Sequence, residues 1–488
     1  MQVYSVIRCK NLINGEMRES TNDDFIKSIN PATGELVGLA PNSQIEVARE
    51  AIESARTAID RSDWSRSPVA RSKALYSLSE AMVDNYDALV NLLIRDAGKT
   101  VSDSKLEIDL CCDTVEYYAG LARNVYGRTI DLSPTATSFL VREPLGVIGI
   151  ITPWNWPLLL LLRSLAPALA AGNAVVIKPA SLTPVVNYKF IDVLQSTHMF
   201  PSGIVNYVTG PGPVVGTEIV RNENVDMISF TGETVTGKEI LKLGAESIKR
   251  VSLELGGKSP NIVFEDAPFE KSIRAALKGA FLTAGQVCFA GSRLLVQDSV
   301  HDSFVKKATE LAKQMKVGYG LSPSIEIGPL ISKTQLDSVM EYVKDGKKHS
   351  KLVTGGEVLT EGELSKGFFV SPTIFDDVPT DSKIAKEEIF GPVLSVIPFK
   401  SDDEAIAIAN DSKYGLAAAI WTANLNRALG TARKIKAGTV WINTYGKNYA
   451  PAEFGGFRQS GLGRVRGLSG LYEFTEMKNI NVDTAREF

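Results

Sequence analysis

Short runs of β-branched residues alternate with amphipathic stretches from about residue 145 onward, and this alternation constrains the fold more than any other feature. Strands that alternate with helices form parallel sheets that are covered by helices on both faces. We therefore predict an α/β protein with two such units in sequence, which meet near residue 257. The first series of runs is VIGII, NAVVIK, IVNYVTG and MISFTG, and the second is SRLLVQ, VLSVIPF, LAAAIWTA and GTVWIN.

Two flanking segments complete the predicted architecture. Between residues 45 and 98, apolar residues recur every three or four positions, which predicts helices and a helix end at Gly98. The tail LYEFTEMKNINV alternates weakly and predicts one more strand. An exposed strand at a chain terminus often pairs with another chain, so the tail is a candidate for self-association.

Charge and composition exclude two classes of partner. The 488 residues include 53 lysines and arginines against 56 aspartates and glutamates, a net charge of -3, whereas nucleic-acid-binding proteins usually carry a basic excess. The uncharged stretch from Pro144 to Leu162 contains three prolines and two glycines, so it is not the continuous apolar helix of about 20 residues that a bilayer requires. We expect no nucleic-acid and no membrane partner, and we interpret the stretch as a buried strand, a turn and a buried helix.

The cysteines argue against a metal site. Cys9, Cys111, Cys112 and Cys288 are scattered without a CxxC pair, and none of the three histidines lies near a cysteine. This pattern predicts neither a zinc site nor a disulfide scaffold. The segment MQVYSVIRCKNLINGE also lacks the long apolar core of a signal peptide. We therefore expect no metal, and we expect the protein to be cytoplasmic.

Cys288, in the stretch FLTAGQVCFAGSR, is the candidate for chemistry. Free cysteine is among the most buried residue types, and we interpret Cys111 and Cys112, which lie within a helical pattern, as core residues. Cys288 differs because a helical segment ends there and small residues follow, which leaves room for a substrate carbon to reach the sulfur. A thiol with a pKa of about 8.5 needs local activation. From these residues alone, Cys288 is either a buried hydrophobe or a nucleophile.

Seven motifs in a fixed order identify a resemblance. Over nearly its whole length the chain resembles the aldehyde dehydrogenase superfamily, whose non-CoA-acylating members use NAD or NADP. The resemblance implies a Rossmann-like dinucleotide-binding domain (residues 1–125 and 145–256), a second α/β catalytic domain (257–456) and a small β oligomerisation extension (126–144 and 472–488) that joins a homodimer or homotetramer. The motifs are PWNWP, KPASLTP, FTGETVTG, LELGGKSP, GQVCFAGSR, EEIFGPV and GGFRQSGLGR.

The resemblance assigns three catalytic residues. Cys288 attacks the aldehyde carbonyl to give a thiohemiacetal, and Asn155 stabilises the oxyanion together with the backbone N–H of the nucleophile. After hydride transfer, Glu254 activates the water that hydrolyses the thioester. The residues themselves leave alternatives open. In one, Asn155 only stabilises the turn between Pro153 and Pro157. In the other, Glu254 is a structural residue paired with a basic side chain. Two further alternatives are a CoA-acylating enzyme, against which the retention of Glu254 argues, and a non-catalytic relative, against which the retention of both Cys288 and Glu254 argues.

The cofactor site is predicted from the resemblance, because the usual GxGxxG fingerprint is absent. Gly210, Gly212 and Gly216 have one spacer too many, and a proline-rich turn is the alternative interpretation. In the family the pyrophosphate lies at the start of the helix after the FTG motif. Lys178 contacts the adenosine ribose, Glu388 holds the nicotinamide ribose and Phe390 lies near the ring. The full predicted set is Trp154, Lys178, Ala180, Ser181, Gly212, Phe230, Thr231, Gly232, Glu233, Glu388 and Phe390.

Two positions depart from the family pattern. Glu233 stands where many relatives carry serine, and its carboxylate repels a pyrophosphate unless it points outward. Ser181 stands where NAD-preferring relatives usually carry a glutamate that binds the ribose hydroxyls. Without that carboxylate nothing at this position repels a 2′-phosphate. We predict that NADP is accepted or preferred, with NAD as the alternative.

The substrate prediction depends mainly on Arg163, which lies eight residues after Asn155. Relatives that act on succinate semialdehyde, and some that act on small hydroxyaldehydes, carry arginine there, and a guanidinium binds a carboxylate in bidentate fashion. The alternative is a structural arginine paired with an acid or a helix end. Trp156, Leu160 and Phe289 are predicted apolar walls. We expect a short semialdehyde or hydroxyaldehyde such as succinate semialdehyde, with an apolar or amino aldehyde as the alternative.

Overall fold

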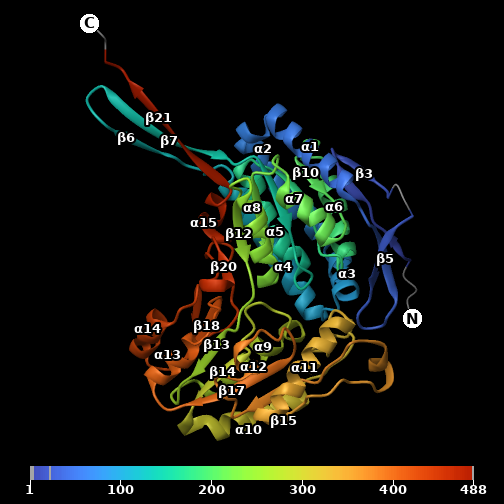
Figure 1. Cartoon of the computed structure of the whole chain (residues 1–488), viewed down its shortest axis with the longest axis vertical. Helices are drawn as coiled ribbons and strands as arrows, with labels where there is room; N and C mark the ends of the chain where they lie inside the picture. Colours follow the sequence, from blue (N-terminus) through green and yellow to red (C-terminus); the bar gives the residue numbers. More distant parts are fainter. Residues whose placement is uncertain (1–4, 21–22, 486–488) are drawn as a thin grey trace.

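Two α/β lobes lie one above the other, and a three-stranded arm projects from the upper lobe (Figure 1). The computed structural model describes residues 5–20 and 23–485. Residues 1–4 and 21–22 of the predicted dinucleotide-binding domain, and residues 486–488 of the predicted oligomerisation segment, lie outside the described residues. The predicted α/β class, with a Rossmann-like lobe, a second α/β lobe and a β extension, is confirmed.

The upper lobe is built on an eight-stranded sheet with a parallel centre. Its strand order is β20-β12-β11-β8-β9-β10-β2-β3, and the five strands from β12 to β10 are parallel. Strands β9, β10 and β11 are buried along their whole length, as expected where helices cover both faces. The strands are β2 (Asn11–Ile13), β3 (Glu16–Arg18), β8 (Val147–Ile151), β9 (Ala174–Lys178), β10 (Val205–Tyr207), β11 (Met227–Thr231), β12 (Arg250–Glu254) and β20 (Gly461–Leu462).

A smaller sheet and a layer of helices surround this core. Strands β1 (Ile7–Arg8), β5 (Leu36–Pro41) and β4 (Phe25–Ile29) form a three-stranded sheet in that order. The helices are α1 (Ile45–Arg61), α2 (Pro68–Asp84), α3 (Tyr86–Ala97), α4 (Val101–Leu121), α5 (Pro157–Ala171), α6 (Pro184–Ser196), α7 (Thr217–Arg221), α8 (Thr234–Ala245) and α15 (Gly467–Tyr472). The apolar residues of this lobe, from strands and helices alike, form one continuous core.

The helical region predicted for residues 45–98 is present with one difference. The longer predicted stretch is divided into α2 and α3 at Asn85, whose side chain donates to the Ala81 carbonyl (2.9 Å) and so ends α2. Helix α3 ends at Gly98, as predicted. Gly98 has φ +70°, and a Cβ there would lie 2.6 Å from the Pro31 ring, so this position requires glycine.

The uncharged stretch after Pro144 becomes strand β8, a turn and helix α5, as predicted. All 15 residues of α5 are buried, and the helix stops at Gly172 in the left-handed conformation. Helix α5 is shorter than the roughly 20 residues that cross a bilayer. Elsewhere in the described ranges, too, no helix combines the length and apolarity of a membrane span.

The lower lobe carries the second predicted series of strands in a seven-stranded sheet. Its order is β15-β16-β17-β14-β13-β18-β19, and every neighbouring pair is parallel except β15 with β16. The strands are β13 (Pro260–Val263), β14 (Arg293–Gln297), β15 (Lys351–Thr354), β16 (Thr373–Asp376), β17 (Val393–Phe399), β18 (Ala417–Trp421) and β19 (Thr439–Ile442). The helices are α9 (Phe269–Phe281), α10 (Asp298–Gln314), α11 (Lys333–His349), α12 (Lys383–Lys386), α13 (Asp402–Asn410) and α14 (Leu425–Lys434).

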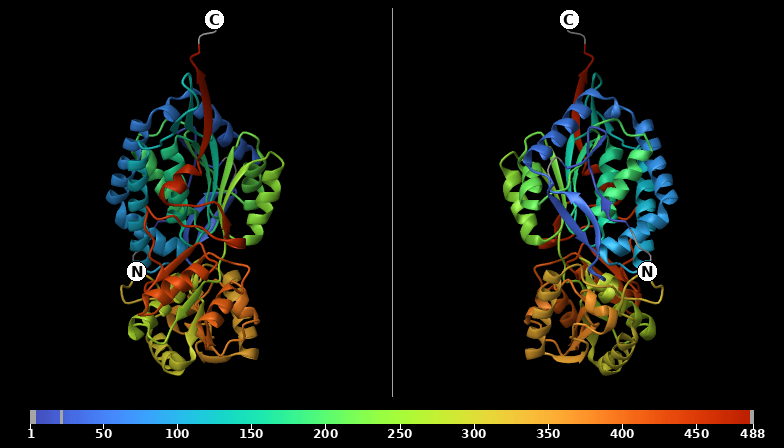
Figure 2. Two further views of the ribbon diagram at one scale, coloured as in Figure 1. Left: turned by 90° about the vertical axis from the view of Figure 1, so that its left-hand side faces the viewer. Right: turned by 90° about the vertical axis from the view of Figure 1, so that its right-hand side faces the viewer.

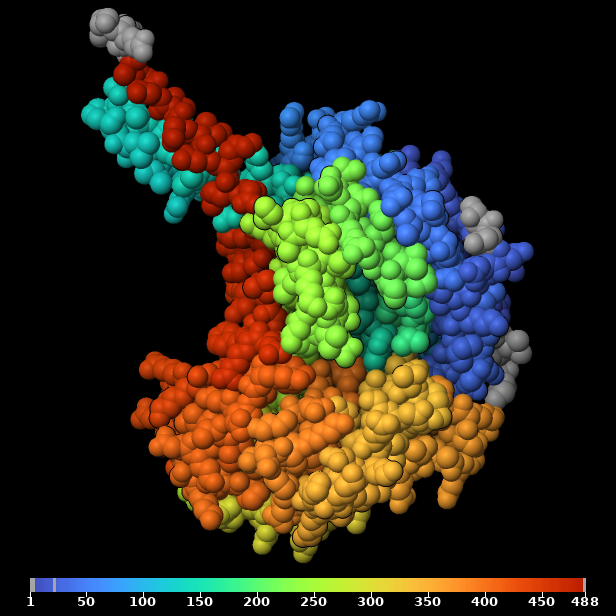
Figure 3. Space-filling model, viewed as in Figure 1, coloured from blue at the N-terminus to red at the C-terminus, as the bar shows by residue number. Residues whose placement is uncertain are grey.

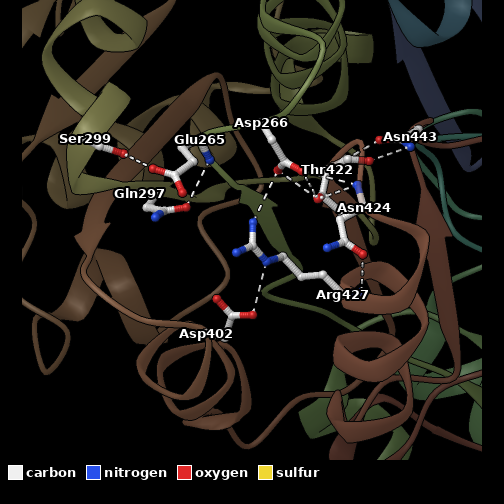
Figure 4. A network of polar contacts seen from close by, with 9 residues as sticks. All are labelled: Glu265, Asp266, Gln297, Ser299, Asp402, Thr422, Asn424, Arg427 and Asn443. Atoms are coloured by element: carbon white, nitrogen blue, oxygen red, sulfur yellow. Dashed lines mark hydrogen bonds and ion pairs between the residues drawn. The ribbon is translucent and has the colours of Figure 1, made fainter.

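The carboxyl edge of the lower sheet is closed by its own polar network (Figure 4). Asp266, just after β13, accepts from the hydroxyl of Thr422 (2.8 Å) and from the amide of Asn424 (3.2 Å), both just after β18. Arg427 lies between Asp266 and Asp402, at 3.4 and 3.2 Å. The donors and acceptors of this network therefore find their partners within the lower lobe. At the opposite edge of this sheet, residues that precede β14 and β17 line one cavity together with residues that follow β8, β11 and β12 of the upper lobe.

The arm contains the strand predicted in the tail. Strands β6 (Arg128–Asp131), β7 (Ala136–Pro144) and β21 (Thr475–Asp483) form an antiparallel sheet in the order β21-β7-β6, which stands clear of both lobes (Figures 2 and 3). Side chains along β6 and most of β21 are exposed, including those of Ile480 and Val482. An edge strand with exposed apolar side chains is suited to pairing with another chain. That pairing, and the predicted domain boundaries, stay predictions.

Candidate active site

The candidate site lies where the carboxyl ends of the upper strands meet the amino ends of the lower strands. Asn155 follows β8, Glu254 ends β12, and Cys288 lies in a turn ahead of β14. Ligands of parallel sheets bind outside the carboxyl ends of the strands, and here the second lobe covers that edge. Three residues that lie far apart in the sequence are thereby brought into one place.

Two cavities meet at Cys288. A cavity of about 330 Å³ is lined by residues predicted for the cofactor, and a narrower one of about 60 Å³ by residues predicted for the substrate. Asn155, Leu160 and Cys288 line both cavities. A reactive group at Cys288 is therefore accessible from two sides. The larger cavity also contains Trp154, Thr231, Gly232, Glu233, Glu254, Glu388 and Phe390, and the smaller one Trp156, Arg163 and Phe289.

The loop that carries Cys288 has an unusual backbone. Helix α9 ends at Phe281, and Thr283 (φ 50°), Ala284 (φ 55°) and Gly285 (φ 74°) are left-handed in succession. Non-glycine residues in this region cost about 1–3 kcal/mol each, so surrounding contacts must hold them. A Cβ at Gly285 would lie 2.1 Å from the Gly391 carbonyl oxygen, which explains the glycine of GQVC. The loop is a fixed scaffold for the thiol.

Gln286 anchors this loop from within. Its Nε2 donates to the Thr283 carbonyl (3.0 Å) and its Oε1 accepts from the Ile331 amide (2.9 Å). The Gln286 carbonyl in turn accepts a hydrogen bond from Asn155 Nδ2 (2.9 Å). Asn155 is buried, and its amide reaches across to the Cys288 loop instead of bonding to its own turn. This contact supports the oxyanion interpretation over the turn interpretation.

Burial dominates the electrostatics of Cys288 and Glu254. Desolvation raises the pKa of Cys288 to about 12, although the Arg163 charge lowers it, so the resting thiol is neutral. Desolvation also raises the pKa of Glu254 to about 7, opposed by the charges of Arg163, Arg464 and Arg466. Glu254 Oε1 is buried and has no hydrogen-bond partner in the part of the chain that the structure describes. A carboxyl group poised near neutrality is suited to exchange protons, and the alternative of a structural ion pair finds no support here.

On the cofactor side, Glu233 and Glu388 face the larger cavity. Glu233 precedes the first turn of α8, whose N–H groups have no side-chain cap. Burial raises the pKa of Glu388 to about 7, and its Oε1 accepts from the Gly257 amide (3.2 Å). Phe390 is left-handed (φ 56°), and its ring meets Trp154 edge to face at 5.4 Å.

The other predicted cofactor residues do not line this cavity. Lys178 is buried at the end of β9, where its Nζ donates to the Pro179 carbonyl (2.8 Å) and burial lowers its pKa to about 8. Next to it, Ser181 donates to the Gly210 carbonyl (3.3 Å). Further residues predicted for this site lie close by in sequence or structure: Ala180 precedes Ser181, Gly212 begins a π-helical turn, and the Phe230 ring lies against Gly232.

Two buried arginines lie on the wall of the substrate cavity. Arg163 donates through Nη2 to the Thr231 hydroxyl (3.0 Å), whereas its Nε has no partner among residues 5–20 and 23–485. Arg466, which has a positive φ of 65° just before α15, leaves Nη1 without a partner in the same ranges. Neither forms an ion pair with any described carboxylate. Burial, reinforced by Arg163, lowers the pKa of Arg466 to about 10. The predicted alternative of an acid-paired Arg163 is therefore not observed.

A group of potential metal ligands lies elsewhere. Within the described residues, His301, Asp376 and Asp377 are close enough together to share an ion, and they lie at the far edge of the lower sheet. The His301 Nε2 is 2.9 Å from Asp376 Oδ1, and this contact raises the pKa of His301 to about 9. The geometry is that of a His–Asp ion pair, and the expected absence of a metal stays a prediction.

Comparisons with known proteins identify the family. The sequence profile of the aldehyde dehydrogenase family matches residues 17–480. The chain is 42% identical over 475 residues to the betaine aldehyde dehydrogenase of Bacillus subtilis, covering 97% of each protein. The chain belongs to the aldehyde dehydrogenase family. It is therefore an NAD(P)-dependent aldehyde oxidoreductase, as predicted from the motifs.

Solved structures agree with this assignment. The betaine aldehyde dehydrogenase of Staphylococcus aureus, crystallised in complex with NAD+, superposes with a TM-score of 0.96 at 38% identity and covers 98% of this chain and 95% of that one. A mutant of the aldehyde dehydrogenase of Bacillus cereus superposes with a TM-score of 0.95 at 40% identity, and the match covers 98% of this chain and 97% of that one. The aldehyde dehydrogenase fold thus extends over nearly the whole described chain.

Sequence reasoning missed several residues that shape the site of this aldehyde dehydrogenase. Arg466 lies just beyond the GGFRQSGLGR motif, and no periodicity marks it. Gln335 donates to the Phe390 carbonyl (2.9 Å) from α11, far away in sequence. Asp103 accepts from the Thr283 amide (3.1 Å). Only Gln286, inside the GQVC motif, carried a usable signal.

The raised pKa of Glu254 generates a pH prediction. If Glu254 accepts a proton during turnover, kcat rises as pH increases through about 7, because the carboxyl group is protonated and inactive below that value. We expect Glu254→Gln to lower kcat by about 100-fold and to abolish this inflection. The measurement is steady-state formation of reduced nucleotide from about pH 5.5 to about pH 9, a range that brackets the expected inflection.

Glu388→Gln is the matched control, because burial places its pKa at about 7 as well. The control is expected to weaken cofactor binding while the inflection in kcat persists. If instead the inflection survives in Glu254→Gln and disappears in Glu388→Gln, the proton acceptor is not Glu254.

Proposed function

We propose that this enzyme oxidises a short aldehyde with a distal carboxylate, such as succinate semialdehyde, to the corresponding acid. The observation that carries the proposal is the pair of buried guanidinium groups, Arg163 and Arg466, on the wall of the cavity that ends at Cys288. Buried charges without a partner are costly, and an anionic substrate supplies the missing partner. Planar guanidinium groups bind carboxylates in bidentate fashion, which also orients the substrate.

The proposed chemistry begins at Cys288. Its thiol loses a proton to the Glu254 carboxylate as the sulfur attacks the aldehyde carbon, and the carbonyl oxygen becomes an oxyanion. Asn155 Nδ2 has one hydrogen fixed on Gln286, which leaves the other to stabilise the oxyanion together with the Cys288 amide. A bound nicotinamide dinucleotide supplies the hydride acceptor. After hydride transfer, Glu254 releases the thiol proton to solvent and is a carboxylate again. It then takes a proton from water as the water oxygen attacks the thioester carbon. The Cys288 thiolate leaves and regains a proton from Glu254 as the acid is released.

Water is the proposed acyl acceptor. Glu254 Oε1 is buried and has no partner among the described residues, so it is free to activate water, which supports hydrolysis over transfer to coenzyme A. Transfer to coenzyme A needs no base that activates water. Adding coenzyme A to the assay is expected to leave the rate unchanged.

The residues of the larger cavity fit a dinucleotide. The uncapped first turn of α8 offers N–H groups to a pyrophosphate. Gly232 and Gly256 line this cavity where no Cβ fits, since a Cβ would lie 2.4 Å from the Phe230 ring and 2.0 Å from Glu388, respectively. Glu388 is placed to accept hydrogen bonds from a ribose, whereas Glu233, exposed at the cavity edge, opposes a pyrophosphate unless it turns outward.

The arginines also argue against a cationic substrate. Two relatives described above are betaine aldehyde dehydrogenases. Quaternary ammonium groups are bound by aromatic faces, and Trp156, Phe289 and Phe454 do line the substrate cavity here. However, two guanidinium groups in the same cavity repel a cation, and like charges at close range cost several kcal/mol. We therefore favour an anionic aldehyde over betaine aldehyde.

We further propose that the enzyme is a homodimer or homotetramer in the reducing cytoplasm. The exposed edges of the β21-β7-β6 arm support self-association. The cysteines within the described residues are all free, which suits a reducing compartment.

A substrate panel tests the proposal. We expect kcat/KM to be higher for succinate semialdehyde than for butanal or betaine aldehyde. Arg163→Leu and Arg466→Leu should each raise KM for succinate semialdehyde about tenfold or more, because a charge-assisted hydrogen bond is lost. KM for butanal should stay constant or fall, since the cavity becomes more apolar.

Arg163→Lys is the matched control, which keeps the charge and loses the bidentate geometry. Its KM for succinate semialdehyde should lie between those of the wild type and of Arg163→Leu. Faster turnover of betaine aldehyde than of succinate semialdehyde by the wild type would falsify the proposed substrate class, while leaving the Cys288 chemistry intact.

Cofactor choice is tested separately at Ser181. With no carboxylate at this position, we expect the wild type to accept NADP+, and Ser181→Glu to lower kcat/KM for NADP+ by about tenfold or more through charge repulsion. The value for NAD+ should change little or improve. Ser181→Ala is the control, and its ratio of kcat/KM for NADP+ to kcat/KM for NAD+ should equal that of the wild type. An overwhelming preference of the wild type for NAD+ contradicts the proposal.

A further inference from the structure

Three charged residues are buried together behind the candidate active site. Lys99 precedes α4, and Asp103 and Glu107 lie one turn apart on that helix, so they share a face. The Lys99 ammonium is 2.5 Å from Glu107 Oε2, with both side chains fully buried. Replacing a buried ion pair by apolar residues is often neutral or stabilising. The stability of the fold therefore does not explain why these three buried charges are present.

Glu107 caps the helix that follows Asn155. Its Oε1 accepts from the amides of Leu158 (2.9 Å) and Leu159 (3.0 Å), in the first turn of α5. The residue at the N-cap position, Trp156, provides no side-chain cap of its own. A carboxylate from α4 thus satisfies the free N–H groups of α5 and complements the helix dipole.

Lys99 holds the other side of the same turn. Its Nζ lies 3.2 Å from the centroid of the Trp156 ring, over the residue that directly follows Asn155. Because Lys99 is also bound to Glu107, the Trp156 ring and the start of α5 are fixed by one ion pair. The Asn155 backbone is thereby held from its carboxyl-terminal side.

Asp103 holds the loop that carries Cys288. Its Oδ2 accepts from both the amide (3.1 Å) and the hydroxyl (3.2 Å) of Thr283, the first left-handed residue of that loop. The loop is in turn bound to Asn155 through the Gln286 carbonyl. One face of α4 therefore contacts both halves of the predicted oxyanion site.

We infer that Lys99, Asp103 and Glu107 form a positioning cluster that fixes the Asn155 amide relative to the Cys288 sulfur. This inference rests on the proposed roles of Asn155 and Cys288. None of the three lines either cavity at Cys288, so they act through the residues that they hold. What matters in Asp103 and Glu107 is an acceptor oxygen in the right place, because Glu107 accepts from two backbone amides and Asp103 from the amide and the hydroxyl of Thr283. Displacements of about 1 Å in such a site can reduce rates by about 100-fold.

Kinetics of acceptor-deficient and acceptor-retaining variants test the cluster. Glu107→Ala should lower kcat by about tenfold or more with KM for the nucleotide changed less than about twofold. Glu107→Gln, whose amide oxygen still accepts both N–H groups, should recover most of that loss. The aldehyde is whichever member of the panel turns over fastest, so the result does not depend on the proposed substrate.

A double-mutant cycle separates positioning from general stability. If Glu107 acts through Asn155, Glu107→Ala should reduce kcat by less than about twofold in an Asn155→Ala background. Equal fold losses in both backgrounds would show that Glu107 does not act through Asn155, and they would overturn the inference. Lys99→Met, in which an apolar chain replaces the ammonium, repeats the cycle if Glu107→Ala does not fold.

Asp103 is tested without any aldehyde. The alkylation rate of Cys288 by iodoacetamide, followed by peptide mass, should change about threefold or more in Asp103→Ala and return toward the wild type in Asp103→Asn. An unchanged rate in Asp103→Ala would contradict its role in the loop. Failure of the proposed function gives a different result. In that case the enzyme shows no preference for succinate semialdehyde, while the alkylation rates and the double-mutant cycle still come out as predicted here.

Discussion

The hydrogen bond from the Asn155 amide to the Gln286 carbonyl joins the two lobes at the point where both cavities meet. Everything proposed for the site depends on this contact, because it sets the amide of one lobe against the thiol loop of the other. The loop itself is conformationally costly, with Thr283 and Ala284 left-handed, and it is held by contacts from α4 and from Gln286. Local strain of this kind persists only where the surrounding structure compensates for it.

Burial is the second theme of the site. It raises the pKa of Glu254 to about 7 and leaves the Cys288 thiol neutral at rest, so a carboxyl group that exchanges protons near neutral pH shares the site with an uncharged thiol. On the substrate side, Arg163 and Arg466 are buried without an acidic partner among the described residues. These two guanidinium groups are the basis for proposing an anionic substrate instead of a cationic aldehyde such as betaine aldehyde.

The sequence predicted the fold class and the strand–helix alternation because the period of apolar residues records which faces are buried. It also identified the motifs that bring Cys288, Glu254 and Asn155 together. It did not reveal the break of the long helix at Asn85, since a single side-chain hydrogen bond decides that boundary. Nor did it reveal Arg466 or Asp103, whose importance comes from contacts with residues far away in the chain. Such contacts leave no periodic or motif signal.

The central claim is that an acyl group is carried on the Cys288 sulfur during turnover. The most direct measurement is intact and peptide mass spectrometry of Glu254→Gln enzyme mixed with NADP+ or NAD+ and the preferred aldehyde. The account predicts that reduced nucleotide forms slowly, because the base for the thiol is lost, and that it stops at about one equivalent with an acyl adduct on the peptide that contains Cys288, because the base for hydrolysis is lost too. Release of the same equivalent of reduced nucleotide with no adduct on Cys288 would contradict it.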